Sequence, residues 1–358
     1  MNAVERVKRA VHFGKPDRVP LLLYNRDFEQ SDIIVTEVVD HWGGENRDAS
    51  EWGFVWERHD GTMGQPRAPV MKSWDGLERF EASDPEDPGR FAAVAGVMDR
   101  YGDKYHVASL ALTGFTLMTM LRGFSDTLEG LYLEPEKTGT LADIVFGFEE
   151  KVIEGCNGRG FGAVGFFDDW GTQSGLIISP ALWREFFKPR YKRQFDLVHG
   201  LGMDVYFHCC GQIGQIIPDL IETGVDILNL SQPNVFDLEE LGREYAGKVC
   251  FLCPVSYQTT SLTGTKEDIY AEAKALIENL GTADGGFVGY VEEYGSIGLS
   301  EENYRHCVSA FRENGVYKRG AQRSAWMVGQ RNIIGDDESV ICKRGVHNAR
   351  MGGQGEHD

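Results

Sequence analysis

The chain has 358 residues, of which 42% are hydrophobic and 11% aromatic, enough for a large buried core. Its formal net charge of −19 disfavours nucleic acid and anionic membranes as partners, because phosphate groups bind to basic patches. No stretch approaches the run of about 20 apolar residues that spans a bilayer, and the N-terminus has no signal-peptide pattern, so we expect a soluble, cytoplasmic protein.

The first part of the chain predicts two strands separated by a long insertion. RVPLLLY (18–24) is typical of a buried strand, and HVASLALTG (106–114) of a second strand that leads into two helices. Residues 25–105 between them are rich in Trp, Asp and Gly and irregular. We expect this insertion either to close over the site or to form a subunit contact.

Five strand–helix units follow and predict a parallel sheet covered by helices. The helix at 179–202 begins with a Ser cap and a Pro at its first position and closes at Gly202. With the two earlier strands, these units predict a TIM-type barrel of seven or eight strands in a single domain over residues 1–316. A doubly wound open sheet is the alternative, although no GxGxxG motif follows an early strand. The strands of these units are FGAVGFFDDW (161–170), MDVYFHCC (203–210), VDILNLSQ (225–232), KVCFLCPVS (248–256) and GGFVGYVEE (285–293).

The tail, residues 317–358, differs from the rest of the chain. It is rich in Gly and charged residues and has little apolar periodicity. We expect either a poorly ordered extension or an arm that packs on a partner subunit in a homodimer.

Polar side chains collect where successive predicted strands end, which is the edge at which a parallel barrel holds its active site. Random placement would scatter such groups over helices and loops as well, so this convergence indicates an enzyme. The residues concerned are Asp168, Asp169, Trp170, His208, Cys210, Gln232, Cys253, Glu292 and Glu293.

The motif YFHCCG is the most specific of these elements. Residues two apart on a strand share a face, so His208 and Cys210 point the same way and Cys209 points the other way. An imidazole and a thiolate on one face can bind one metal ion, and this pair favours zinc. The seven cysteines are odd in number and scattered, which favours reduced thiols. Alternatively, His208 is a hydrogen-bonded core residue and both cysteines are small buried hydrophobes.

A catalytic zinc usually takes three protein ligands, so one more is needed. Cys253, Glu292 and Glu293 are the candidates, since they end later strands. Cys250 and Cys253 face opposite sides of their strand, and we expect Cys250 to belong to the core.

Further residues near the strand ends are candidates for catalysis and substrate binding. Asp168 and Asp169 either hold a substrate polar group or a metal-bound water, or they cap a helix or bind backbone amides. Gln173 follows in the same loop and is the third catalytic candidate. The residues expected to contact substrate are Tyr24, Arg26, Trp170, Tyr206 and Gln232.

Four motifs together resemble the uroporphyrinogen decarboxylase superfamily over about residues 3–315. The resemblance implies a (β/α)8 barrel with a deep cleft at the carboxyl ends of the strands. The motifs are RVKRAVHFGKPDRVP, DDWGTQSGLIISPALWREFFKPRYKRQFDLVHGLG, FHCCGQIGQIIPDLIETGVDILNLSQP and GTKEDIYAEAKALIENLGTADGGF.

Two activities compete within that superfamily. Its decarboxylases bind a polycarboxylated tetrapyrrole with an arginine-rich N-terminal motif and without a metal, whereas LLLYNRDFEQ lacks that arginine pair. Its methylcobamide:coenzyme M methyltransferases hold zinc with a His-x-Cys, which His208 and Cys210 match, and a later cysteine, which GGFVGYVEEY lacks.

The resemblance therefore implies a zinc-dependent methyltransferase that moves a methyl group between a small substrate and a corrinoid (cobalamin), free or carried by a corrinoid protein. A metal-independent decarboxylase of a porphyrinogen or another carboxylic acid is the alternative. A third possibility is a non-catalytic module that binds a corrinoid or a tetrapyrrole.

Overall fold

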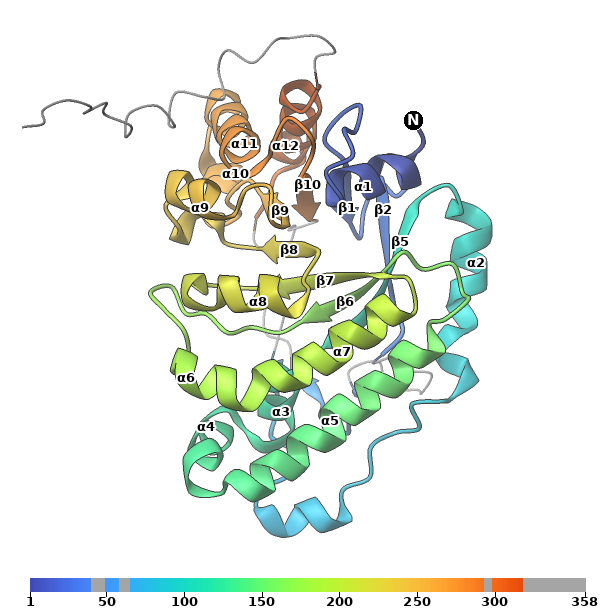
Figure 1. Cartoon of the computed structure of the whole chain (residues 1–358), viewed down its shortest axis with the longest axis vertical. Helices are drawn as coiled ribbons and strands as arrows, with labels where there is room; N and C mark the ends of the chain where they lie inside the picture. The colour runs from blue at the N-terminus through green and yellow to red at the C-terminus, as the bar shows by residue number, and fades with distance from the viewer. Residues whose placement is uncertain (40–48, 58–64, 293–297, 318–358) are drawn as a thin grey trace, which may run out of the picture. The chain divides into compact units, whose positions relative to one another are not determined.

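Eight parallel strands form one sheet that curls into a nearly closed barrel (Figure 1). The computed structural model describes residues 1–39, 49–57, 65–292 and 298–317. The strands run in the spatial order β1-β10-β9-β8-β7-β6-β5-β2, and the two end strands also contact each other. The predicted (β/α)8 class is therefore confirmed. The strands are β1 (Leu21–Tyr24), β2 (Ile33–Glu37), β5 (Tyr105–Leu112), β6 (Ala163–Phe167), β7 (Asp204–Cys209), β8 (Ile227–Leu230), β9 (Cys250–Pro254) and β10 (Phe287–Glu292).

Helices connect the strands and cover the outer face of the barrel (Figure 1). The caps predicted from sequence form: Ser179 accepts a hydrogen bond from the Leu182 amide, and Pro180 begins the helix. Within the described residues, no helix is both long and apolar enough to cross a membrane. These helices are α3 (Gly114–Arg122), α4 (Phe124–Leu133), α5 (Pro135–Gly155), α6 (Pro180–Leu182), α7 (Lys188–Gly200), α8 (Ile217–Thr223), α9 (Leu238–Tyr245), α10 (Thr260–Thr263), α11 (Lys266–Leu280) and α12 (Glu301–Asn314).

The segment between the first two predicted strands contains one barrel strand of its own. β2 follows β1 after the short loop 25–32, with no helix between them, so the long excursion begins after β2. A strand of only five residues, IIVTE, carries little periodicity, which explains why the sequence did not reveal it. The excursion contains the hairpin β3 (Trp56–Glu57) and β4 (Gln65–Pro66), two short 3-10 helices and α2 (Ala92–Tyr101).

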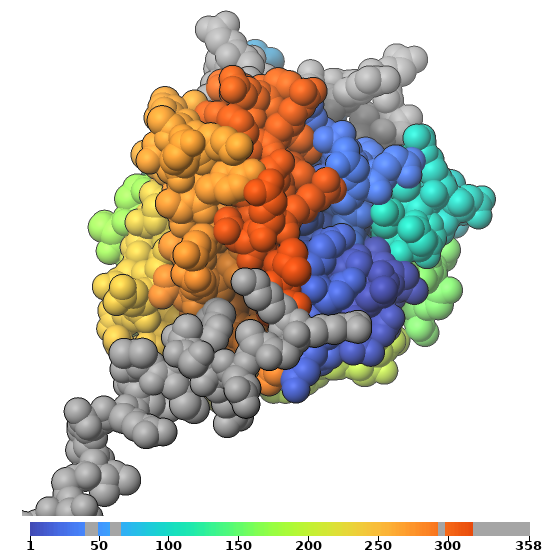
Figure 2. Space-filling view, turned by 90° about the horizontal axis from the view of Figure 1, so that it is seen from above, coloured from blue at the N-terminus to red at the C-terminus, as the bar shows by residue number. Residues whose placement is uncertain are grey.

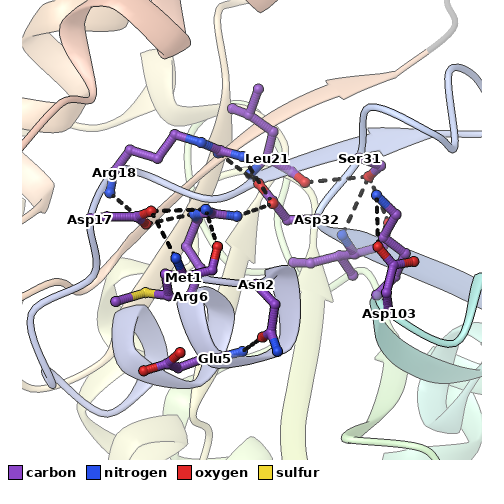
Figure 3. A network of polar contacts seen from close by, with 12 residues as sticks. Met1, Asn2, Glu5, Arg6, Asp17, Arg18, Leu21, Ser31, Asp32 and Asp103 are labelled. Atoms are coloured by element: carbon purple, nitrogen blue, oxygen red, sulfur yellow. Dashed lines mark hydrogen bonds and ion pairs between the residues drawn. The ribbon is translucent and has the colours of Figure 1, made fainter.

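The seam between β1 and β2 is closed by a buried ionic network that starts on the first helix, α1 (Ala3–Val11), as Figure 3 shows. Asp32 Oδ2 accepts a hydrogen bond from the Leu21 amide at 2.9 Å, and the Asp32 amide donates to the Leu21 carbonyl at 2.8 Å. Arg6 Nη1 and Arg18 Nη1 bind the same carboxylate at 2.8 and 2.7 Å. Arg6 Nε also binds Asp17 at 2.7 Å. Hydrogen bonds and ion pairs of side chains thus take the place of a complete ladder of backbone hydrogen bonds between β1 and β2.

Two separate apolar clusters lie on the two faces of the barrel wall. Along β7, Tyr206 belongs to the interior cluster, whereas Phe207 and Cys209 belong to the larger cluster beneath the helices. Val7 and Val11 of α1 pack into the interior cluster, so α1 covers the amino-terminal end of the barrel. Side chains two or four residues beyond Tyr206 lie on the same face of the strand. They therefore point into the carboxyl end of the barrel, opposite α1, where a parallel barrel holds its active site.

The N-terminal segment and helix α12 lie side by side on one face of the described unit (Figure 2). Arg18 forms an isolated antiparallel bridge with Val316, and the guanidinium of Arg26 lies 4.1 Å from the centre of the Tyr304 ring. The residues Met1–Tyr317 form one compact unit. The predicted extension at 317–358 lies, beyond Tyr317, outside the described residues.

Candidate functional site

Asp169, His208 and Cys210 meet at the carboxyl ends of the neighbouring strands β6 and β7. Their candidate ligand atoms all lie within 4.8 Å of one another. His208 Nε2 lies 3.7 Å from Cys210 Sγ and 3.8 Å from Asp169 Oδ1. The Cys210 amide donates to Asp169 Oδ1 at 2.8 Å, and the Asp169 amide donates to Thr116 Oγ1 at 2.8 Å. Both chain segments of the group are thus fixed by backbone hydrogen bonds.

Asn229 on β8 orients the imidazole of His208. The Asn229 amide group donates to the Leu252 carbonyl at 2.9 Å, so its oxygen must face the other way. That oxygen accepts from the Tyr206 hydroxyl at 2.8 Å and lies 2.6 Å from His208 Nδ1. His208 Nδ1 therefore carries the proton, and the lone pair of Nε2 points toward Cys210. Asn229 was missed at the sequence level, although an asparagine within a fully buried strand is a signal of such a role.

The three side chains fit a zinc-type ion in both chemistry and spacing. Zinc–ligand bonds of about 2.0–2.3 Å place two tetrahedral ligand atoms about 3.5 Å apart, and the observed separations from His208 Nε2 are 3.7 and 3.8 Å. Burial, and then the nearby Asp169 carboxylate, raise the pKa of the Cys210 thiol well above its usual range. A bound divalent cation would offset both effects and replace the thiol proton.

Two of the third ligands expected from sequence, Cys253 and Glu292, do not join this group. Cys253 is fully buried in the cluster beneath the helices, while Cys250 faces the barrel interior, as strand alternation requires. Glu292 ends β10 and accepts a hydrogen bond from the Tyr290 hydroxyl at 2.6 Å, apart from the three-residue group. Glu293 lies outside the described residues. Asp169, expected as a catalytic residue, occupies the third position instead.

Asp168 and Trp170 are core residues and not part of the open site. Asp168 is fully buried and accepts hydrogen bonds from the Phe115 and Thr116 amides at 3.0 and 2.8 Å, at the start of α3. The Tyr191 hydroxyl also donates to it. Burial raises the pKa of Asp168 to about 7. Trp170 stacks on Phe115 with ring centres 4.5 Å apart and donates through Nε1 to the Tyr191 hydroxyl. Asp168 thus binds backbone amides at the start of α3, which is one of the two interpretations that the sequence left open.

Two of the expected residues meet beside the three-residue group. Gln173 Nε2 donates to Gln232 Oε1 at 2.9 Å across the ends of β6 and β8. The hydroxyl of Tyr257, which sequence reasoning missed, interacts with both Gln232 and Cys210. Burial raises the pKa of Tyr257, with the Cys210 thiol as the next cause. These side chains can position a polar substrate next to the sulfur.

The other residues that we expected to contact substrate lie either in the barrel interior or near its outer surface. Tyr206 is buried below His208, and the Tyr24 ring meets the Tyr290 ring edge-on at 6.2 Å. Arg26 forms an ion pair with Glu301 of α12 and does not reach the three-residue group.

Comparisons with known proteins place the chain in a family. A methyltransferase from Methanosarcina mazei superposes with a TM-score of 0.64 at 17% identity and covers 87% of this chain and 99% of its own. A 3-keto-D-glucoside 4-epimerase from E. coli gives a TM-score of 0.40 at 13% identity and covers 67% of this chain and 85% of its own. At these identities the first likeness shows the shared fold alone, and no curated protein matches the sequence. The family model described as uroporphyrinogen decarboxylase (URO-D) matches residues 52–313, and the chain belongs to this family.

Proposed function

We propose that this chain is a zinc-dependent methyltransferase that moves a methyl group between a small substrate and a corrinoid, either free or carried by a partner protein. The observation that supports this most directly is the convergence of an imidazole, a thiol and a carboxylate, His208, Cys210 and Asp169, at the functional end of the barrel. Sulfur and nitrogen together favour zinc over the harder metals. The name of the M. mazei neighbour agrees with the proposed reaction class.

Each residue of the site has a distinct task in this proposal. His208, Cys210 and Asp169 hold the ion, and Asn229 keeps the Nε2 lone pair of His208 available to it. The ion supplies positive charge that lowers the pKa of a bound acceptor group. Gln173 and Gln232, together with Tyr257, position the substrate beside the ion. With an oxygen ligand in place of a second sulfur, acceptors other than thiols, or removal of a methyl group from an oxygen, become accessible.

The name of the family, uroporphyrinogen decarboxylase, favours a second candidate, a metal-independent decarboxylase. Binding a polycarboxylated substrate takes arginines that face the site. Arg26, the arginine next to β1, is instead paired with Glu301, and Glu292 lies at the end of β10. These placements favour the methyltransferase. Turnover of a porphyrinogen by protein treated with a chelator would support the decarboxylase.

Metal analysis of the purified chain tests the metal centre. We expect about one zinc per chain after expression with added zinc, and loss of that zinc in His208→Ala and Cys210→Ala. Cys253→Ala is the matched control, because it removes a buried thiol that faces the helices, and it should keep its zinc. Methyl transfer is then followed by the absorbance change of methylcobalamin with a panel of acceptors. Zinc well below one per chain, unchanged in His208→Ala, would remove the basis of the proposal.

A further inference from the structure

An aromatic wall made of two ring pairs lies in the barrel interior, one pair beside the candidate metal centre and the other on β1 and β10. We define this aromatic wall as Tyr24, Phe167, Tyr206 and Tyr290. The Phe167 ring lies 5.1 Å from the His208 ring and 5.7 Å from the Tyr206 ring, and Tyr24 meets Tyr290 at 6.2 Å. Tyr24 and Phe167 are partly exposed, whereas Tyr206 and Tyr290 are buried. The three-residue group is therefore bordered by the Phe167 ring, and the second ring pair lies in the same interior cluster.

Negative charge surrounds this aromatic wall. Glu292 accepts the hydroxyl hydrogen of Tyr290 at 2.6 Å. The pKa of Tyr24 is raised, first by burial and then by the carboxylates of Glu37 and Glu292, so both carboxylates lie close enough to affect the phenol. Burial also raises the pKa of the Tyr206 hydroxyl, and Tyr24 and Glu292 are the next causes. The carboxylate of Glu292 therefore opposes any further negative charge beside these phenols.

The described residues provide no lysine or arginine ion pair to neutralise Glu292 or Asp169. Arg26, which follows β1 closely in sequence, is paired with Glu301 on α12. A divalent ion bound by the Cys210 thiolate and the Asp169 carboxylate would carry no net charge. Glu292 would then remain beside the aromatic wall as an anion without a lysine or arginine partner among the residues that the structure describes.

We propose that the small substrate of this site is an organic cation, a quaternary or protonated amine that carries N-methyl groups. Its positive charge lies against the faces of the partly exposed rings, where the ring quadrupole attracts cations, and Glu292 provides the counter-charge. An anionic substrate would face Glu292 and be repelled. This inference gives the substrate class of the proposed methyltransferase and rests on that function only for the transfer step. The binding preference rests on the rings and on Glu292 alone.

Calorimetric titration of the full chain tests the proposal with three probes: choline, tetramethylammonium and 3,3-dimethyl-1-butanol, a neutral molecule with the shape of choline. Choline should bind about tenfold more tightly than the neutral alcohol. Glu292→Gln should remove most of this difference, because the amide keeps the Tyr290 contact without the charge. Tyr24→Phe should keep the affinity and Tyr24→Leu should lose about tenfold. Glu301→Gln is the matched control, since it removes an exposed carboxylate outside the site.

Equal affinity for choline and the neutral alcohol, or no binding of either, overturns the proposal. So does an unchanged choline affinity in Glu292→Gln. If that variant fails to fold, the salt dependence of the wild type decides: choline binding should weaken as sodium chloride rises, while binding of the alcohol should not. Titrations run with and without zinc separate the two proposals. Choline selectivity without any zinc binding removes only the metal centre, and zinc binding without choline selectivity removes only the cationic substrate.

Discussion

Asn229 Oδ1 lies 2.6 Å from His208 Nδ1, and this contact decides which nitrogen of the ring can bind a metal ion. The asparagine cannot present its amide hydrogens to the ring, because they are engaged by the Leu252 carbonyl at 2.9 Å. The hydroxyl of Tyr206 donates to the same oxygen and holds it in place. A residue that never touches the ion thus sets the protonation pattern of its ligand.

Removing the side chain of Asn229 should therefore weaken zinc binding without removing any ligand. We expect Asn229→Ala to raise the zinc dissociation constant at least about tenfold, because the imidazole loses its fixed orientation. Competition with a chromophoric chelator measures the effect. Asn234→Ala is the control, since Asn234 is an asparagine on the loop after β8 that contacts only Gln258 among the described residues. Equal affinities in the two variants would show that Asn229 has no part in metal binding.

Strand alternation made part of the site predictable from the sequence. A period of two residues separates His208 and Cys210 from Cys209, and Cys209 does lie in the cluster beneath the helices. The same rule did not place Cys253, which was expected at the site and also lies beneath the helices. The third member of the group was not predictable in this way. Asp168 and Asp169 are adjacent acids at one strand end, and their different roles depend on the first turn of α3, far away in sequence.

The barrel was predictable for a related reason, with one exception. Long apolar runs followed by amphipathic stretches predict strand–helix units, and these units are confirmed. β2 breaks this pattern, because it follows β1 without a helix and its side chains alternate only weakly in burial. Its position in the barrel depends on the contacts of Asp32 with Leu21 and the two arginines, which are tertiary and leave no periodic signal.

Substitution of the two adjacent aspartates, Asp168 and Asp169, should have different effects, one on stability and the other on zinc binding. Asp168→Asn should lower the free energy of unfolding by about 2–3 kcal/mol, because a buried amide group would then face the donors of Phe115 and Thr116. Asp169→Asn should leave stability almost unchanged, since Asp169 is partly exposed, but should weaken zinc binding. Chemical denaturation and chelator competition on both variants provide the measurements. Loss of zinc in a folded Asp168→Asn protein would contradict this division of roles.

The ionic network at the barrel seam should contribute strongly to stability. Arg6→Met leaves Asp17 without its guanidinium partner and Asp32 with Arg18 alone, and we expect a loss of about 3 kcal/mol in the free energy of unfolding. Arg9→Met is the matched control on the same helix, because Arg9 forms an exposed pair with Glu5 and an exposed hydrogen bond to the Gly14 carbonyl, and its loss should cost less than about 0.5 kcal/mol. Urea denaturation of the two variants measures both values. A similar loss in both would assign the effect to helix α1 as a whole.

The buried carboxyl group of Glu149 should make the free energy of unfolding depend on pH. Burial raises its pKa to about 8, while its oxygens accept hydrogen bonds from the Gly114 amide and from Gln194. The folded chain then holds a proton that the unfolded chain releases above its ordinary pKa. The free energy of unfolding should therefore fall as pH rises toward 8, by up to about 1.4 kcal/mol per pH unit.

Glu149→Gln should remove this contribution, because the amide has no proton to lose in that range. Its own amide hydrogens need an acceptor, and Gln194 Oε1, which is buried without a hydrogen-bond partner in the described structure, can supply one if the Gln194 amide turns over. Urea midpoints at pH 5, 6.5 and 8 measure the effect. The wild type should lose more stability across this range than the variant, although Asp168, whose pKa burial raises to about 7, keeps some slope in both. Parallel curves would mean that Glu149 is ionised in the folded chain and that its hydrogen bonds outweigh its burial.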